Sequence, residues 1–211
     1  MATAWIAGGS GLVGGALLAL LLEDEDFDHV VSVGRRRLPL DHPKLTQVLT
    51  EFTSPLHLGD VPPPTVAFSC LGTTIKKAGY LKQAFRMVDH DSVVAFAEAA
   101  RQKGASVFIH VTALGADPRS RTFYSAVKGE TEQAVARLGF ATVYALRPSI
   151  LDGPRSERRP AERLGLAVAR ALGPLLGRYR PTPVAAVART MVLLAATPSP
   201  GIHTVENTSI A

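Results

Sequence analysis

Short apolar runs alternate with longer stretches in which apolar residues recur at helical spacing along this chain. The short runs are rich in β-branched residues, as strands are. The expected strands are Thr3–Ala7, Val30–Gly34, Thr46–Leu49, Thr65–Cys70, Ser106–Val111, Ala141–Leu146 and His203–Glu206, and the expected helices are Val13–Leu22, Lys82–Lys103, Ser125–Leu138 and Val184–Ala196. Such alternation is typical of βαβ units. The pattern therefore predicts an α/β fold with a doubly wound parallel sheet of about seven strands and helices on both faces.

Three connecting segments complete this picture. Leu56–Asp60 is expected to form a short helical turn, and Pro62–Pro64 a rigid connector, because proline cannot continue a helix. Residues 152–163 are read as a polar excursion.

With 211 residues, the chain can bury one full core but is short for two domains. We expect a single Rossmann-like domain over 1–211, with a core over 1–147 and a small, reduced C-terminal region over 148–211.

The composition excludes several classes of site. The single cysteine, Cys70, cannot form an internal disulfide, and no cysteine and histidine residues have metal-ligand spacing, so no metal site is predicted. The apolar run Leu12–Leu22 contains two glycines and ends in four acidic residues, which argues against a membrane span or a signal peptide. These features favour a cytoplasmic protein without membrane contact.

The net charge of +5 comes with arginines gathered at 35–37 and 155–170. Such clusters attract an anionic ligand or a nucleic acid. The basic residues are not interleaved with aromatic residues, and no helix-turn-helix or zinc pattern is present. A small polyanion is therefore the favoured ligand, and no nucleic acid is expected.

A glycine-rich segment follows the first expected strand and opens the first expected helix. It consists of Gly8, Gly9, Ser10, Gly11, Leu12, Val13 and Gly14. A strand, a glycine turn and a helix in this order form the context of a dinucleotide-binding fingerprint. Gly8 permits the tight turn, Gly11 lets the backbone approach a pyrophosphate, and Gly14 lets the helix pack closely on the strand.

The second strand ends in arginines where NAD-specific proteins place an acid that binds the ribose 2′-hydroxyl. Arg35 and Arg36 stand at this place, about twenty residues after the glycine turn. Guanidinium groups suit bidentate contacts to a 2′-phosphate. NADP(H) is therefore the preferred cofactor and NAD(H) the alternative; a solvated basic loop is the competing interpretation.

Tyr124 and Lys128 stand four residues apart at the start of an expected helix, and hence on one helical face. The positive charge of Lys128 favours the phenolate form of Tyr124, so this tyrosine can donate and retake a proton. Thr112, just after the fifth expected strand, offers a hydroxyl to the same region.

At this point the sequence resembles the atypical branch of the short-chain dehydrogenase/reductase superfamily that includes the Tat-interacting-protein-type oxidoreductases and is related to the NAD-dependent epimerases and dehydratases. Besides the glycine turn, the matching segments are Val33–Arg36, Cys70–Gly79, Val88–Asp89, Ala113–Asp117, Phe123–Glu130 and Arg147–Gly153. The resemblance covers nearly the whole chain.

The resemblance implies roles for individual residues. Tyr124 would be the general acid/base, Lys128 would hold the nicotinamide ribose, and Thr112 would steady the substrate oxygen. Besides the glycine turn and the two arginines, the residues lining the cofactor would be Cys70, Leu71, Gly72, Thr73, Thr74, Tyr124, Lys128 and Arg147. Two departures stand out: the family usually has serine at Thr112, and the region after Arg147 is shorter than the substrate lobe of sugar-nucleotide epimerases.

Other residues admit two interpretations each. His110 is read as a buried, hydrogen-bonded histidine, and Cys70 as core filler rather than a nucleophile. Asp89 either props the catalytic lysine or faces solvent. The charged residues of the polar excursion either grip an anionic substrate or form a solvated surface; they are Arg155, Glu157, Arg158, Arg159 and Glu162.

The leading functional hypothesis is an NADP(H)-dependent oxidoreductase that reduces a carbonyl, or oxidises a hydroxyl, of a small molecule, with an anionic substrate as one option. The alternative is an NADPH-binding sensor without turnover, which acts on a protein partner. A sugar-nucleotide epimerase or dehydratase is a third reading. The alanine- and leucine-rich faces of the helices expected at 82–103 and 125–138 suit either a homodimer or core packing.

Overall fold

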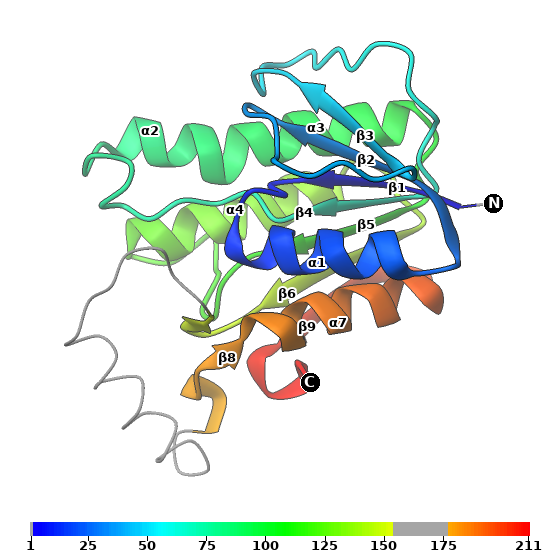
Figure 1. The fold of residues 1–211 in the computed structure, drawn as a ribbon. Coiled ribbons are helices and arrows are strands. Elements are labelled where there is room, and N and C mark those ends of the chain that lie inside the picture. The colour runs from blue at the N-terminus through cyan, green and yellow to red at the C-terminus, as the bar shows by residue number, and fades with distance from the viewer. Residues whose placement is uncertain (1, 154–176) are drawn as a thin grey trace.

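A parallel sheet of seven strands organises the computed structural model, which describes residues 2–153 and 177–211. The strand order is β3-β2-β1-β4-β5-β6-β9, and every neighbouring pair is parallel (Figure 1). The strands are β1 (Ala2–Ala7), β2 (Phe27–Gly34), β3 (Leu45–Leu49), β4 (Val66–Ser69), β5 (Val107–Val111), β6 (Thr142–Arg147) and β9 (Gly201–Glu206). This confirms the predicted doubly wound, Rossmann-like sheet.

Helices cover both faces of the sheet (Figure 1). One face carries α1 (Leu12–Glu23) and α7 (Val184–Ala196); the other carries α2 (Lys82–Arg86), the π-helical turn η1 (Met87–Asp91), α3 (Ser92–Gln102) and α4 (Phe123–Ala136). The shorter elements are β7 (Leu151–Asp152) paired with β8 (Thr182–Pro183), and the 3-10 turns η2 (Gly177–Tyr179) and η3 (Asn207–Ser209). The long helices agree with the predicted ones to within a few residues.

Two apolar layers form the core, one on each side of the sheet. Along β1, Ile6 packs with α1 and α7, whereas Trp5 packs with α3. Successive side chains of a strand point to opposite faces, so a strand buried on both faces must be apolar at every position. The alanines of α3 are also buried in this core, which accounts for that helix face without a second copy of the chain.

Two expectations, one for a connecting segment and one for a helix, are wrong in detail. Leu56–Asp60 is not helical: Gly59 has a φ of +71°, and Pro55 and Pro62 flank the segment. Leu58 is nevertheless buried against Trp5's layer, and the Trp5 indole donates a hydrogen bond to the Pro62 carbonyl (2.8 Å). The single helix expected at 82–103 is interrupted by η1, because a π-helical turn inserts one extra residue into a helix.

The C-terminal region, expected as a small and reduced part, also builds the sheet and its cover. Its helix α7 packs beside α1, and its strand β9 pairs with β6 and completes the sheet. The buried Asn207 amide donates hydrogen bonds to the carbonyls of Arg178 (2.9 Å) and Arg180 (2.8 Å), and its oxygen accepts one from the Ser149 N–H (3.2 Å). Asn207 therefore joins residues on both sides of 154–176 to the end of the sheet. The charged residues predicted at 155–162 lie outside the described residues.

Two kinds of structure are not found in the described part of the chain. No helix there is long and apolar enough to cross a membrane. No three histidine, cysteine, aspartate or glutamate side chains gather there in a way that could hold a metal ion.

Neighbouring glycines of α1 give a matched test of packing. A Cβ on Gly14 would lie 2.1 Å from the backbone oxygen of Gly8, whereas a Cβ on Gly15 would meet nothing closer than 3.5 Å. We predict that Gly14→Ala destabilises the fold by about 1–3 kcal/mol through overpacking, and that Gly15→Ala stabilises it by up to about 1 kcal/mol through higher helix propensity. Urea unfolding of both variants measures this; equal effects would contradict it.

His110, in β5, makes folding sensitive to acid. Burial, with a smaller contribution from the charge of Lys128, lowers the pKa of His110 to about 3. Between about pH 3 and about pH 6.5, His110 therefore binds a proton in the unfolded chain but not in the folded chain. We therefore predict that this residue's contribution to stability is intact above about pH 6.5 and is lost toward pH 3, by up to about 1.4 kcal/mol per pH unit.

Urea unfolding of the wild type and of His110→Asn from pH 7 to pH 4 checks this prediction. The variant should lose part of the acid slope. His29→Asn, at an exposed position on β2, should keep it. An unchanged slope in His110→Asn would refute the assignment.

Candidate functional site

The glycine turn after β1 lies directly against the end of β4. Gly8 has a φ of +88°, and a Cβ there would lie 2.7 Å from the Cys70 carbonyl oxygen. Within the turn, the N–H of Gly11 donates a hydrogen bond to the Gly8 carbonyl (2.9 Å). In open α/β sheets, ligands bind where the strand order reverses. In this sheet the strand order reverses between β1 and β4, so the glycine turn lies at that binding crevice.

The N-terminus of α1 offers its backbone N–H groups to a ligand. Gly11 is the cap residue; it forms no side-chain cap, and no acidic residue stands in the first turn. Free N–H groups and the helix dipole favour an anion at such an end. Together with the close backbone approach at Gly8 and Gly14, this geometry fits the pyrophosphate of a dinucleotide.

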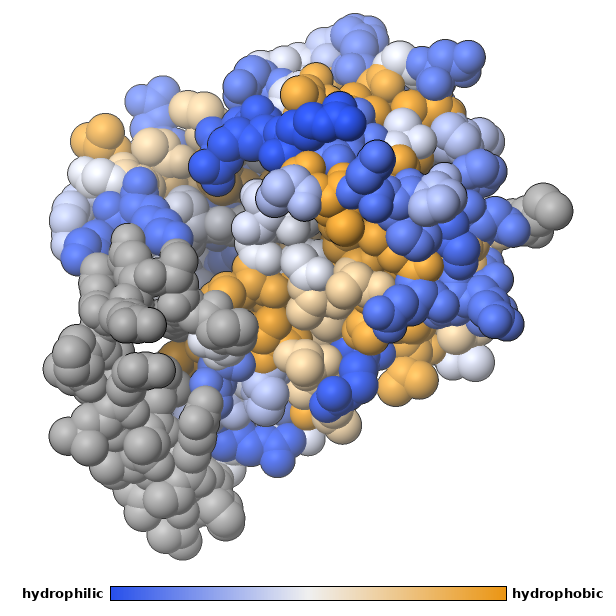
Figure 2. Space-filling model, in the orientation of Figure 1, coloured by the Kyte–Doolittle hydropathy of each residue, from blue (hydrophilic) through white to orange (hydrophobic). Residues whose placement is uncertain are grey.

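The arginine run follows β2, the neighbour of β1. Arg35 and Arg36 are exposed, and Leu38 of the same loop packs toward the turn, where its Cδ1 would lie 3.3 Å from a Cβ on Gly9. The loop is thus folded back over the glycine turn. The space-filling view is hollowed near the edge where the strands end, below a strongly hydrophilic band (Figure 2).

Tyr124 and Lys128 lie one turn apart near the start of α4, as the sequence predicts. The Tyr124 ring is half-buried and packs against the buried Phe85 ring of α2, with the ring centres 5.5 Å apart. Lys128 is buried, although it carries a charge. A buried ammonium is stable only with a close counter-charge.

Asp89 supplies that counter-charge. Its Oδ1 lies 2.8 Å from the Lys128 Nζ, and its Oδ2 accepts a hydrogen bond from the Thr73 N–H (2.8 Å). Burial raises the pKa of Asp89, and Lys128 and the Thr73 N–H oppose this shift. The solvent-facing interpretation of Asp89 is therefore wrong: its side chain is fully buried and holds the lysine.

The π-helical turn η1 brings Asp89 to this position. The Thr131 hydroxyl of α4 lies within hydrogen-bond distance of the Asp89 carbonyl (2.9 Å), and the Ser92 hydroxyl donates to the Met87 carbonyl (2.7 Å). These contacts bind backbone carbonyls of the widened turn to α4 and α3. π-helical turns are frequent at functional sites, and no periodicity in the sequence signals this one.

The loop after β4 runs beside the Lys128–Asp89 pair. A Cβ on Gly72 would lie 3.5 Å from Asp89 Oδ1 and 3.6 Å from Lys128 Nζ. Leu71, Gly72 and Thr73 are thus brought next to the lysine, and through Cys70 next to the glycine turn. Burial raises the pKa of the Cys70 thiol to about 12, which keeps it protonated, in line with a packing role.

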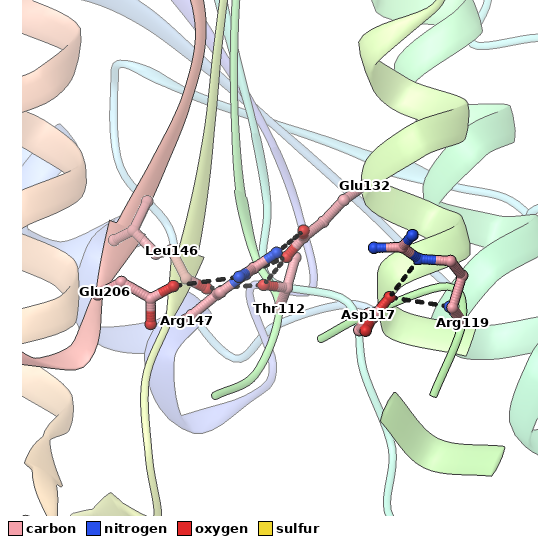
Figure 3. Close-up of polar contacts among 7 residues, drawn as sticks. All are labelled: Thr112, Asp117, Arg119, Glu132, Leu146, Arg147 and Glu206. Carbon is pink, nitrogen blue, oxygen red and sulfur yellow. Dashed lines mark hydrogen bonds and ion pairs between the residues drawn. The ribbon is translucent and has the colours of Figure 1, made fainter. Parts of the chain in front are cut away.

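Thr112 and Arg147 lie in a separate polar network (Figure 3). The Thr112 hydroxyl donates to Glu132 (2.6 Å), and the Arg147 guanidinium binds Glu132 (2.6 Å) and Glu206 (3.1 Å). Its hydrogen bond with Glu132, above all, raises the pKa of Arg147. The described contacts of Thr112 and Arg147 are therefore structural, and their roles toward substrate and cofactor stay predictions.

Glu132 is a residue that the sequence analysis missed. It continues the four-residue spacing of Tyr124 and Lys128 along α4 and connects this helix to β6 and, through Arg147, to β9. The spacing was a visible signal, but an acidic residue on a helix has too many other uses to be singled out from the sequence.

Solved structures with this fold include proteins in complex with NAD. MoeE5 in complex with UDP-glucose and NAD superimposes with a TM-score of 0.73 at 20% identity, covering 97% of this chain and 76% of that one. A short chain dehydrogenase family protein from Francisella tularensis gives 0.63 at 14% identity, covering 99% and 98%. At these identities the likeness shows the fold alone. No family model matches the chain.

Curated relatives are more similar in sequence. Protein fmp52, mitochondrial, of Emericella nidulans is 34% identical over 180 residues, which is 82% of this chain and 77% of that protein. Protein HTATIP2 of Rattus norvegicus is 34% identical over 211 residues, or 98% and 86%. The expectation of a cytoplasmic location is contradicted by the fungal relatives, whose names place them in mitochondria.

These relatives agree with the resemblance found in the motifs, and they match over most of their own length. Three features have the arrangement that the resemblance implies. They are the order of the strands, the glycine turn at the point where that order reverses, and the helix that carries Tyr124 and Lys128. The chain belongs to the atypical short-chain dehydrogenase/reductase superfamily, in the branch of the FMP52 and HTATIP2 proteins.

Proposed function

We propose that this protein is an NADPH-dependent oxidoreductase that reduces the carbonyl of a small molecule, with Tyr124 as the proton donor. A nicotinamide dinucleotide as cofactor class agrees with the neighbours of this fold that were solved with NAD. The observation that carries the proposal is the buried Lys128–Asp89 ion pair, one helical turn from Tyr124 and beside the Gly72 loop.

Backbone groups at the glycine turn would hold a dinucleotide, because no side chains stand in the way there. The bare backbone at Gly8 and Gly11 and the uncapped start of α1 would hold the pyrophosphate. Arg35 and Arg36 would bind a 2′-phosphate through charge-assisted hydrogen bonds. Leu71, Gly72 and Thr73 would face the cofactor between the glycine turn and Lys128. The bound nicotinamide supplies the hydride.

Proton transfer is the task of α4. As the substrate carbonyl gains electrons, its oxygen takes the proton of the Tyr124 hydroxyl. The Lys128 ammonium stabilises the phenolate that remains, and Asp89 fixes the ammonium on that side of the helix. Phe85 holds the phenol ring in place by a tilted ring contact. Position and a matched acid are what a protein adds to nicotinamide chemistry.

Removal of the Tyr124 hydroxyl tests the mechanism. We predict that Tyr124→Phe lowers turnover by about 10²–10⁴-fold, since a positioned acid contributes roughly that factor, and leaves NADPH binding within about twofold. The assay is a panel of aldehydes and ketones with NADPH, read by loss of nicotinamide absorbance. Tyr80→Phe, at an exposed position, should retain full activity.

Two outcomes would contradict this assignment. Full turnover in Tyr124→Phe would exclude the phenol as the acid. A wild type that binds NADPH but reduces no member of the panel would instead favour the sensor without turnover.

Removal of the positive charges after β2 tests the cofactor preference. We predict that Arg35→Ser and Arg36→Ser each weaken NADPH binding by about tenfold to hundredfold, the value of a hydrogen bond between charged groups, and leave NADH binding unchanged. Arg189→Ser, an exposed arginine on α7, is the control. Calorimetric titration with both nucleotides measures the difference; equal losses for NADH and NADPH would show that these arginines do not read the 2′-phosphate.

A further inference from the structure

A buried polar pair lies on the sheet beneath the catalytic helix. Ser69 ends β4 and His110 stands in β5, and the register places the two side by side. Each is only 1% exposed. In the described part of the chain, the Ser69 hydroxyl and both ring nitrogens of His110 have no hydrogen-bond partner.

Such atoms are costly to leave alone. An unsatisfied buried polar atom destabilises a fold by about 1–3 kcal/mol, so nearly all of them have protein or water partners in folded proteins. A neutral imidazole has one donor and one acceptor nitrogen, and burial keeps His110 neutral because it lowers the pKa of that residue to about 3. The pair therefore calls for a partner that both donates and accepts hydrogen bonds.

The surroundings place this pair beneath the ion pair of the catalytic site. Ser69 and His110 lie on the face of the sheet that carries η1 and α4, the face of the Phe108 ring, which packs 5.6 Å from the His110 ring. Asp89 and Lys128 belong to those two elements. Ser69 also leads directly into the loop of Gly72, where a Cβ would lie 3.6 Å from Lys128 Nζ.

Small side chains flank the pair across the sheet. Ala7 of β1 pairs with Ser69, and Ala145 of β6 pairs with His110, so the row reads alanine, serine, histidine and alanine over four strands. The row below it contains Trp5, Ala67, Phe108 and Val143, which fill the core. The row that contains the pair is thus the one with small residues and polar atoms. A water molecule needs such room and two to four polar partners.

We propose that Ser69 and His110 form a buried water-binding site beneath the ion pair of Lys128 and Asp89. Water is the ligand because it alone donates and accepts at this size. The ammonium has three hydrogens, and the structure directs it toward Asp89 on one side. A water bound to His110 and Ser69 takes a second hydrogen and fixes the ammonium from below. The value of this for catalysis rests on the proposed function, whereas the site itself does not.

A crystal structure of the full chain at high resolution, without substrate, is the direct test. We expect ordered water within hydrogen-bond distance of a His110 ring nitrogen, of the Ser69 hydroxyl and of Lys128 Nζ. A direct hydrogen bond between Ser69 and His110, with no water, would overturn the proposal. Water that contacts the pair but not Lys128 would overturn its connection with the catalytic site.

Nuclear magnetic resonance gives a second measurement on the protein in solution. The His110 ring N–H should show a cross-relaxation peak with long-lived water, which Ser69→Ala should abolish. Ser106→Ala, at an exposed position just before β5, should leave the peak unchanged. No such peak in the wild type would refute the site. Because neither measurement uses turnover, a protein without reductase activity can still confirm the water site.

Discussion

The need to neutralise one buried ammonium governs the packing around α4. Lys128 is held away from solvent, an unpaired charge there would destabilise the fold, and Asp89 is the group that compensates it. That carboxylate also binds the backbone of the loop after β4 through Thr73. A single ion pair therefore fixes the helix that carries Tyr124 against the loop after β4. Loss of either partner would leave the other charged and buried, which generally costs about 3–5 kcal/mol.

The shape of the glycine turn, in contrast, depends on close backbone packing and not on charge. The turn after β1 approaches the end of β4 so closely that Gly8 has no room for a side chain, and α1 packs so closely on the turn that Gly14 has none. The same approach leaves amide groups at the start of α1 open to a ligand. The glycine turn and the Lys128–Asp89 pair are thus held by different forces, and the loop after β4 contacts both of them.

Much of this arrangement could be predicted from the sequence. The parallel sheet follows from the apolar runs, because strands buried on both faces must be apolar throughout, and the glycine turn is readable from its position between a strand and a helix. The π-helical turn was beyond prediction, since one additional residue in a helix leaves no periodic trace, and with it the burial of Asp89. The network of Glu132 and Arg147 was also missed, because its members come from segments far apart in the chain.

Asn207 concentrates several attachments in one side chain. Its buried amide fastens the chain at Ser149 and again at Arg178 and Arg180, directly after the last strand of the sheet. Replacement of this one side chain would consequently remove three backbone contacts at once. The segments that lead into β7 and β8 would then lose their common attachment to the end of β9.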